Sequence, residues 1–183
     1  MSRILLGLGS NTAYNGCSPV GLLGRACTAL SGNVADIVCS SVYRTKAMYV
    51  TEQDDFYNMA VKGTVENFGP RDLLAFIHRI EASLGRNRNR EYRFGPRTLD
   101  IDIELFGTIA VDEPDLQIPH PRIHERGFVL VPALEILTEP ADCIERERFS
   151  AYVQNLSDPG VRLFLPASDF RKAFFPEAAN GTE

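Results

Sequence analysis

Two aspartates separated by one residue, Asp100 and Asp102, stand near the middle of the chain. In an extended strand, residues two positions apart point to the same face, which places their Cα atoms ~6–7 Å apart. Two carboxylates this close repel each other unless a cation lies between them. Magnesium prefers carboxylate oxygen and commonly takes one or two carboxylates together with nucleotide phosphates. The pair therefore predicts a divalent-metal site, and the alternative is the solvated face of an amphipathic strand.

An arginine cluster precedes the aspartates. Five arginines fall within twelve residues, and Glu91 is the only acid between them: Arg86, Arg88, Arg90, Arg93 and Arg97. Such a cluster is unusual in a chain whose formal net charge is −5. The planar guanidinium fork suits bidentate contacts to phosphate oxygens. Carboxylates beside arginines predict a site for a magnesium–polyphosphate complex, although individual arginines could instead belong to a solvated basic loop paired with nearby acids.

The common phosphate-binding motifs are absent from the sequence. It contains neither the glycine-rich P-loop that ends in lysine nor the protein-kinase motifs. Gly7-Leu8-Gly9 lacks the third glycine of the dinucleotide-binding fingerprint. Phosphate binding by this chain must therefore use another arrangement of residues.

The strand that carries the aspartates is the clearest element in the sequence. Residues 98–106 alternate, with the acids on one face and four apolar residues on the other: Leu99, Ile101, Ile103 and Leu105. Glu104 is the third acid of the polar face. It is predicted to be a solvated residue, with an effect on metal affinity as the alternative.

The remaining elements follow from apolar spacing and turn residues. Strands are predicted at 3–9, 34–44 and 56–66, helices at 18–31 and 70–84, and polar loops at 45–55 and 86–97. Their order predicts an α+β fold with a ferredoxin-like βαββαβ core, in which helices flank an antiparallel sheet. Later segments are less periodic. Residues 128–137 are strand-like or short-helical, 145–156 are predicted to form a surface helix, and the tail is frayed from about residue 176.

The composition limits the class of protein. The 183 residues are 44% hydrophobic, which suffices for the core of a single domain over residues 1–183. The acidic balance argues against nucleic-acid binding and against anionic membranes. No apolar run approaches the ~18 residues of a membrane span, and the apolar stretch at the N-terminus is too short for a signal peptide. A monomeric, cytoplasmic protein is expected.

The cysteines and histidines do not suggest a metal site. The four cysteines form no CxxC pair and are expected to be free thiols in a reducing compartment: Cys17, Cys27, Cys39 and Cys143. His120 and His124 are four residues apart, but Pro119 and Pro121 disfavour a helix that would bring them together.

Short motifs spread over residues 4–137 resemble those of one enzyme family. They are Gly9-Ser10-Asn11, Ser40-Ser41-Val42-Tyr43-Arg44-Thr45, Asp55-Phe56-Tyr57-Asn58, Arg79-Ile80-Glu81, Leu84-Gly85-Arg86, Gly95-Pro96-Arg97-Thr98-Leu99-Asp100-Ile101-Asp102, Ile118-Pro119-His120-Pro121-Arg122 and Glu125-Arg126-Gly127-Phe128. In this order and spacing they resemble the 6-hydroxymethyl-7,8-dihydropterin pyrophosphokinase family of folate biosynthesis. The segments 95–103 and 119–128 are the most specific.

The resemblance implies a reaction. ATP and 6-hydroxymethyl-7,8-dihydropterin would bind side by side, and the pterin hydroxymethyl oxygen would attack the β-phosphorus of ATP. The diphosphate moves to the pterin and AMP leaves. Two Mg²⁺ ions would bridge the phosphates, held by Asp100 and Asp102. Such a transfer depends on in-line alignment and charge neutralisation more than on covalent chemistry.

The resemblance also implies roles for individual residues. The catalytic set would be Arg86, Arg97, Asp100 and Asp102. The ATP contacts would come from His78, Glu81, Arg86, Arg88, Arg97, His120 and Arg126. The pterin site would be formed by Thr45, Phe56, Asn58, Phe94 and Phe128. Arg88 would belong to a mobile loop that closes over the site. Without the resemblance, Glu81 reads as an exposed helix carboxylate, His78 as a half-buried histidine, and Phe56 and Phe128 as core residues.

The sequence departs from the family pattern at two positions. Lys46 stands where the family often has proline, and Phe94 where it often has tryptophan. Both affect the expected pterin pocket, but neither removes the aspartate pair. The competing hypothesis is a non-catalytic ferredoxin-like binding module, for example for single-stranded RNA, or an inactive paralogue.

Overall fold

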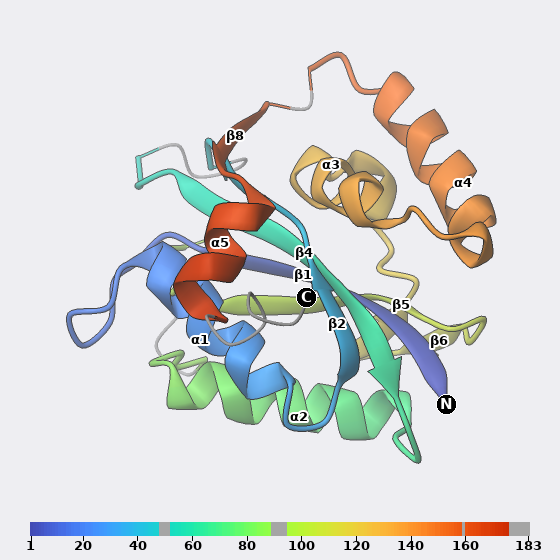
Figure 1. Cartoon of the computed structure of the whole chain (residues 1–183), viewed down its shortest axis with the longest axis horizontal. Helices are drawn as coiled ribbons and strands as arrows, with labels where there is room; N and C mark the ends of the chain where they lie inside the picture. Colours follow the sequence, from blue (N-terminus) through green and yellow to red (C-terminus); the bar gives the residue numbers. More distant parts are fainter. Residues whose placement is uncertain (48–51, 89–94, 159, 176–183) are drawn as a thin grey trace, which may run out of the picture.

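An antiparallel sheet organises the molecule (Figure 1). The computed structural model describes residues 1–47, 52–88, 95–158 and 160–175. The core elements, in chain order, are β1 (Ser2–Ser10), α1 (Pro19–Leu30), β2 (Ala35–Cys39), β3 (Val42–Thr45), β4 (Phe56–Val65), α2 (Pro70–Ser83) and β5 (Asp100–Phe106). The strand order is β5-β1-β4-β3-β8, in which β8 (Val161–Leu165) is the edge strand, and β2 also pairs with β4. With β2 and β3 counted as one strand, the core has the ferredoxin-like order, so the predicted fold is confirmed.

The predicted strand at 34–44 is two strands, β2 and β3. The break falls at Ser40, whose backbone N–H donates to the Ala60 carbonyl while its hydroxyl accepts from the Ala60 N–H. The pairing with β4 also shifts between Ala35 and Val38, where Asp36 has a φ of 52°. The Ser40 hydroxyl thus takes the place of a backbone carbonyl in the pairing with β4, and this interrupts a segment whose composition favours a continuous strand.

The two faces of the sheet are covered differently. On one face Ile4, Leu6 and Leu8 of β1 pack into the main core beneath α1 and α2. On the other face Leu5 and Ala60 pack against α3 (Gly127–Ile136), and α4 (Cys143–Gln154) covers α3 from outside (Figure 1). The alternation of apolar residues along the central strand therefore supplies both cores.

A β-bulge breaks the predicted alternation of β5. The register with β1 pairs Leu5 with Leu105 but Leu6 with Ile103, which leaves Glu104 as an extra residue. As a consequence Leu105 lies in the α3-side core, and the prediction that it shares a face with Ile103 is wrong. The prediction of a solvated Glu104 is also wrong, because this residue is fully buried.

The second half of the chain extends the core. Between β5 and α3 lie β6 (Val111–Glu113), β7 (Leu116–Ile118) and the short helix η1 (Ile123–Glu125), and α4 follows η2 (Pro140–Asp142). The ambiguous segment 128–137 is the helix α3, and α4 corresponds to the predicted surface helix, with Phe149 as its only buried residue. The predicted fraying from residue 176 lies outside the described residues.

Two C-terminal elements were not predicted. The strand β8 (Val161–Leu165) pairs antiparallel with β3 at the sheet edge, and α5 (Ala167–Phe174) buries Phe170 in the main core. Among the residues that the structure describes, no helix has the length and apolarity needed to cross a membrane.

Glu135 ties three of these segments together. Its carboxylate accepts hydrogen bonds from the Ser41 backbone N–H at 2.9 Å, the Ser41 hydroxyl at 2.7 Å and the Tyr43 hydroxyl at 3.0 Å. The Ser41 hydroxyl in turn accepts from the backbone N–H of Ala167, at the start of α5. Burial, followed by Glu135, raises the pKa of Tyr43 to about 12. One carboxylate thus links α3, β3 and α5.

We expect Glu135→Ala to lower the free energy of unfolding by about 2–3 kcal/mol, because charged hydrogen bonds are lost and the buried Ser41 N–H loses its acceptor. Urea denaturation measures the change. The control is Glu147→Ala, which removes an exposed acid of α4 and should change stability by no more than about 0.5 kcal/mol. Equal effects of the two substitutions would contradict the assigned role of Glu135.

Candidate active site

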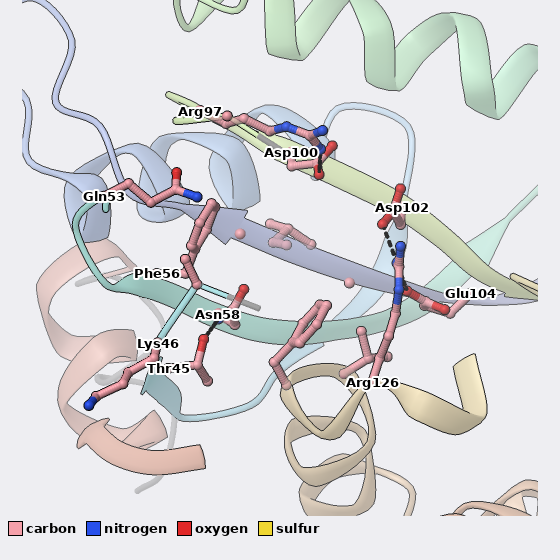
Figure 2. A pocket seen from close by; sticks show the side chains of 17 residues that line it. Thr45, Lys46, Gln53, Phe56, Asn58, Arg97, Asp100, Asp102, Glu104 and Arg126 are labelled. Atoms are coloured by element: carbon pink, nitrogen blue, oxygen red, sulfur yellow. Dashed lines mark hydrogen bonds and ion pairs between the residues drawn. The ribbon is translucent and has the colours of Figure 1, made fainter. Parts of the chain in front are cut away.

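A pocket opens on the α3 side of the sheet, beside the start of that helix (Figure 2). Its floor is β1, where Gly7 and Gly9 face the pocket while Leu6 and Leu8 face the main core. A Cβ atom at Gly9 would lie 2.8 Å from Asn58 Oδ1, and one at Gly7 would lie 3.0 Å from Glu104 Oε1. Gly7 and Gly9 do not belong to a dinucleotide-binding fingerprint. Their lack of side chains leaves space above β1 in the pocket.

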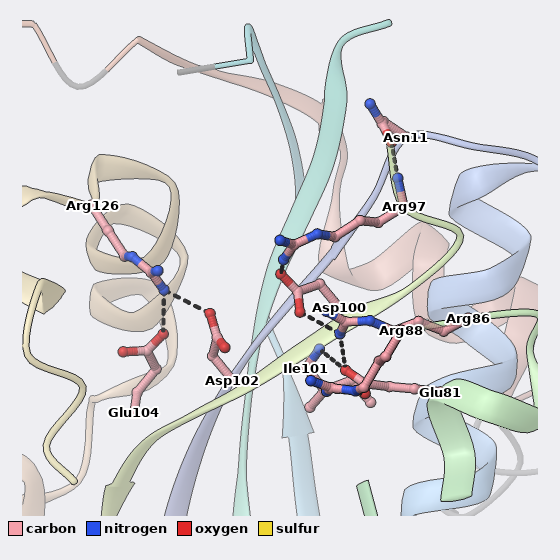
Figure 3. A network of polar contacts seen from close by, with 10 residues as sticks. All are labelled: Asn11, Glu81, Arg86, Arg88, Arg97, Asp100, Ile101, Asp102, Glu104 and Arg126. Carbon is pink, nitrogen blue, oxygen red and sulfur yellow. Dashed lines mark hydrogen bonds and ion pairs between the residues drawn. The ribbon is translucent and has the colours of Figure 1, made fainter. Parts of the chain in front are cut away.

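The acidic wall of the pocket is β5. Asp100 and Asp102 point to the same side, as the strand spacing predicts, and Glu104 follows them (Figures 2 and 3). Asp100 forms ion pairs with Arg86 and Arg97. The structure thus brings the predicted catalytic side chains into one cluster. Arg90 and Arg93 lie outside the described residues.

Arg126 faces the other end of this wall. Its Nη1 lies 2.6 Å from Asp102 Oδ2 and 3.8 Å from Glu104 Oε1. The guanidinium carbon lies 5.6 Å from the centroid of the Phe128 ring, which is within cation–π range. Arg126 immediately precedes α3, so the start of that helix positions both the cation and the aromatic ring.

The pKa of Asp100 reflects its two arginines. Burial by itself raises the pKa of this carboxyl, but Arg97 and Arg86 outweigh burial and the net pKa is lowered. Asp100 is therefore ionised at neutral pH. Glu104 differs from Asp100, because burial first and Asp102 second raise its pKa to about 8, against the influence of Arg126.

Glu81 of α2 is a buried anchor, and the reading of an exposed helix carboxylate is wrong. Its side chain is 1% exposed and pairs with both Arg86 and Arg88. Its Oε1 also accepts the backbone N–H of Ile101 at 2.8 Å (Figure 3). Burial raises the pKa of Glu81, while Arg86 and Arg88 oppose that rise. Glu81 therefore fixes Arg86 against the strand that carries the aspartates.

Two histidines border the network. In His120, Nδ1 accepts the backbone N–H of Arg122 at 3.1 Å, so the neutral ring carries its proton on Nε2. Burial and then Arg126 lower the pKa of His120, against the influence of Asp102 and Asp100. The pKa of His78 on α2 is also lowered, first by burial and then by Arg88 and Arg86. The half-buried reading of His78 agrees with its intermediate exposure.

The opposite wall of the pocket carries the predicted pterin residues. Asn58 Nδ2 donates to Thr45 Oγ1 at 2.8 Å, and both residues are buried. Phe56 and Phe128 line the pocket and are only partly buried. Phe128 also packs against the α3-side core, so the reading of an ordinary core residue is wrong for Phe56 and holds in part for Phe128. Phe94, the fifth residue of this set, lies outside the described residues.

Several contributors were missed by sequence reasoning. Ala47, Gln53 and Gly95 line the pocket. Lys46, which was expected to affect the pterin pocket, also lines it. Asn11 lies in a recognised motif but had no assigned role. Its Oδ1 accepts the Arg97 backbone N–H at 2.7 Å, and its Nδ2 donates to Gln53 Oε1 and to the Asp54 carbonyl, each at 3.1 Å. Asn11 thus joins the loop before β4 and the loop before β5 to the end of β1. Its place in a motif directly after a predicted strand could have indicated this role.

The carboxylates fit a nucleotide-bound magnesium ion better than a resident metal. In the described part of the chain, no group of three or more His, Cys, Asp or Glu side chains is arranged to hold a metal ion. Asp100 and Asp102 offer one or two carboxylate ligands, which is the number that magnesium usually takes from a protein when phosphates complete its shell. All four cysteines are free thiols.

The fold and the pocket together define an α+β protein with a ferredoxin-like sheet and a pocket in which carboxylates of β5 face arginines. A family model, 7,8-dihydro-6-hydroxymethylpterin-pyrophosphokinase (HPPK), matches residues 5–138, and the chain belongs to this family. The family inferred from the sequence motifs is thereby confirmed.

The relatives differ in length. The 2-amino-4-hydroxy-6-hydroxymethyldihydropteridine pyrophosphokinase of Bacillus subtilis is 40% identical over 129 residues, which cover 70% of this chain and 71% of that protein. The mitochondrial folate synthesis bifunctional protein of Arabidopsis thaliana is 41% identical over 103 residues, which cover 56% of this chain and 18% of that protein. This chain therefore spans less than a fifth of the plant relative.

Solved structures share the fold. The crystal structure of Plasmodium falciparum HPPK-DHPS has a TM-score of 0.56 and 14% sequence identity to this chain, and the match covers 89% of this chain and 47% of that one. At this identity the likeness extends to the fold alone.

We expect the His120 imidazole to titrate below the ordinary histidine value of 6.5, because burial and Arg126 disfavour its cation. Proton NMR measures the midpoint, with the resonance assigned by its loss in His120→Gln. Since the folded-state pKa is lowered, the stability due to neutral His120 is present above the unfolded-state value and is lost as the pH falls through the folded-state value. Urea denaturation should therefore show a larger loss between pH 7.5 and pH 5.5 in the wild type than in His120→Gln. A midpoint at or above 6.5 contradicts this.

Proposed function

We propose that this protein transfers the diphosphate group of ATP to the hydroxymethyl group of 6-hydroxymethyl-7,8-dihydropterin and releases AMP. The observation that carries the proposal is the pocket itself. On one wall, Asp100 and Asp102 lie among arginines, and on the other wall an amide and two aromatic rings line the same cavity. Family membership and the substrate in the name of the Bacillus relative support this choice of ligands.

The nucleotide would bind along the acidic wall. Asp100 and Asp102 would hold two Mg²⁺ ions, which neutralise phosphate charge and lower the pKa of a coordinated hydroxyl. In the structure Arg86 and Arg97 neutralise Asp100, so both guanidiniums already lie where triphosphate oxygens would approach the carboxylate. With the ions in place, these arginines would be released to bind phosphate in a bidentate manner.

Three further groups would complete the nucleotide site. Arg126 reaches the same wall from the start of α3, and His120, whose pKa responds to Arg126 and Asp102, would offer its Nε2–H as a donor. Arg88, half-exposed and paired with Glu81, could contact the outer phosphates. Glu81 and His78 would contribute indirectly. Glu81 fixes the position of Arg86 through its ion pair, and His78 lies close enough to Arg86 to interact with its charge.

The pterin would bind on the opposite wall. Asn58 is held by Thr45 through its Nδ2, which fixes the direction in which its Oδ1 can accept from the edge of a flat heterocycle. Phe56 and Phe128 offer aromatic faces for stacking. Gly9 keeps the floor below Asn58 open, so that the ring can reach the amide. The two walls would thus bring the hydroxymethyl oxygen close to the phosphates, as transfer requires.

The wider proposals concern the whole chain. Residues 1–183 would form one domain, because β8 pairs with β3 and α5 contributes Phe170 to the main core.

The free thiols fit a reducing compartment, so we place the protein in the cytoplasm. The acidic surface balance supports small-molecule substrates rather than nucleic acid, and we take the protein to act as a monomer.

We expect purified protein to form AMP only when ATP, the reduced pterin and Mg²⁺ are all present. Asp100→Asn and Asp102→Asn should each reduce turnover by about 10²-fold or more, the usual effect of removing one group that stabilises transition-state charge. Chromatographic measurement of AMP tests this, with Asp112→Asn on β6 as an exposed control of equal charge change. Binding of both substrates without AMP formation by the wild type would show a non-catalytic binding module instead.

We expect Gly9→Ala to weaken pterin binding by about tenfold or more, because the new methyl group would lie 2.8 Å from Asn58 Oδ1 and displace the amide. Pterin fluorescence, titrated in the presence of Mg²⁺ and α,β-methylene-ATP, measures the affinity. Gly32→Ala is the control, since its Cβ would meet only the Ala29 carbonyl at 3.4 Å. In an Asn58→Ala background the substitution at Gly9 should have little further effect, and an undiminished effect there would rule out displacement of the amide.

A further inference from the structure

Glu104 is the most unusual side chain of the pocket. It is fully buried, and neither carboxyl oxygen has a hydrogen-bond partner among the residues that the structure describes. Burial of a carboxyl group without a partner is unfavourable, and an apolar side chain of similar size would normally be preferred at such a position. The packing of β5 therefore does not explain the acid.

The surroundings of Glu104 connect it to the acidic wall. Its side chain lies on the same face of β5 as that of Asp102 and lines the cavity beside Asp102 and Arg126. Its Oε1 lies above Gly7, at 3.0 Å from the position that a Cβ atom would take there. The absence of a side chain at Gly7 thus leaves space for the Glu104 carboxyl at the floor of the pocket.

One guanidinium is shared between two acids at this point (Figure 3). Arg126 Nη1 lies 2.6 Å from Asp102 Oδ2 and 3.8 Å from Glu104 Oε1. A divalent ion coordinated by Asp102 would repel a guanidinium bound to the same carboxylate. Metal binding at Asp102 therefore favours movement of Arg126 away from that residue. The Glu104 carboxyl is 3.8 Å away and has no hydrogen bond to any described residue.

We propose that Glu104 is a positioning residue that receives the Arg126 guanidinium when Asp102 takes a divalent ion. This inference rests on the proposed function, because it assumes that Asp102 is a metal ligand. A charge-assisted hydrogen bond is formed at ~2.8 Å, so Arg126 Nη1 needs to approach Glu104 by only about 1 Å. The exchange frees Asp102 for the ion and keeps Arg126 in the pocket, where it can bind phosphate.

The first test measures metal binding rather than turnover. Mn²⁺ is titrated by electron paramagnetic resonance in the presence of α,β-methylene-ATP, whose α–β linkage cannot be cleaved. We expect Glu104→Gln to weaken Mn²⁺ binding about tenfold, the size of one lost charge-assisted interaction. Glu66→Gln, which removes an exposed acid just after β4, should leave the affinity unchanged. Equal Mn²⁺ affinity in wild type and Glu104→Gln would overturn the inference.

The second test separates the exchange from a direct attraction between Glu104 and the ion. In an Arg126→Met background no guanidinium competes for Asp102, so Glu104→Gln should have no further effect on Mn²⁺ affinity. A direct electrostatic role would give the same tenfold loss in both backgrounds, and that result would refute the exchange.

The third test separates positioning from packing. Glu104→Met fills the same space without a charge, so its thermal unfolding midpoint should equal or exceed that of the wild type while its Mn²⁺ affinity falls. A lowered midpoint with unchanged Mn²⁺ affinity would make Glu104 a packing residue and reject the proposal. If the wild type itself does not bind Mn²⁺ with the nucleotide analogue, the proposed function fails; if the wild type binds and the Glu104 variants match it, only this inference fails.

Discussion

The structure depends on the neutralisation of acids that lie side by side on one strand. Asp100 and Asp102 share a face of β5, and such a face is stable only with cations against it. Arg86 and Arg97 supply the charge for Asp100, and Arg126 supplies it for Asp102. These arginines come from the two segments that border the strand, so the end of α2 and the start of α3 must both converge on β5. The helices are thus placed by electrostatics as well as by packing.

The buried anchors around the pocket hold these arginines and the strand in place. Glu81 holds Arg86 and the Ile101 N–H, and Asn11 holds the backbone of Arg97. Each anchor uses its polar atoms within the protein, which is why each is largely buried. The side chains that face the cavity keep atoms that can contact ligands because these supporting residues fix their positions. The proposed transfer, which relies on alignment and charge neutralisation, would require such preorganisation.

Much of this could be predicted from the sequence, because strand and helix periodicity are strong in the first half of the chain. The alternation around Asp100 and the apolar stripe of α2 placed the aspartates and Arg86 near each other. The bulge at Glu104 could not be predicted, since it depends on the register of β5 against β1. The strand β8 was also missed, because its pairing partner β3 lies more than one hundred residues earlier. The spacing of residues within a short segment cannot reveal such a long-range contact. The burial of Glu81 was missed for the same reason.

The pairing of β8 has a consequence for how the chain tolerates insertion or fusion. Thr45 lies between Phe56 of β4 and Val161 of β8, so one wall of the pocket is the middle strand of a three-stranded ribbon. Leu163 and Phe164 of β8 are exposed at that margin. A sheet margin with uncovered apolar side chains is a site of intermolecular strand addition. An insertion or fusion that disturbs β8 would therefore also disturb the pairing of β3, the strand from which Thr45 reaches the cavity.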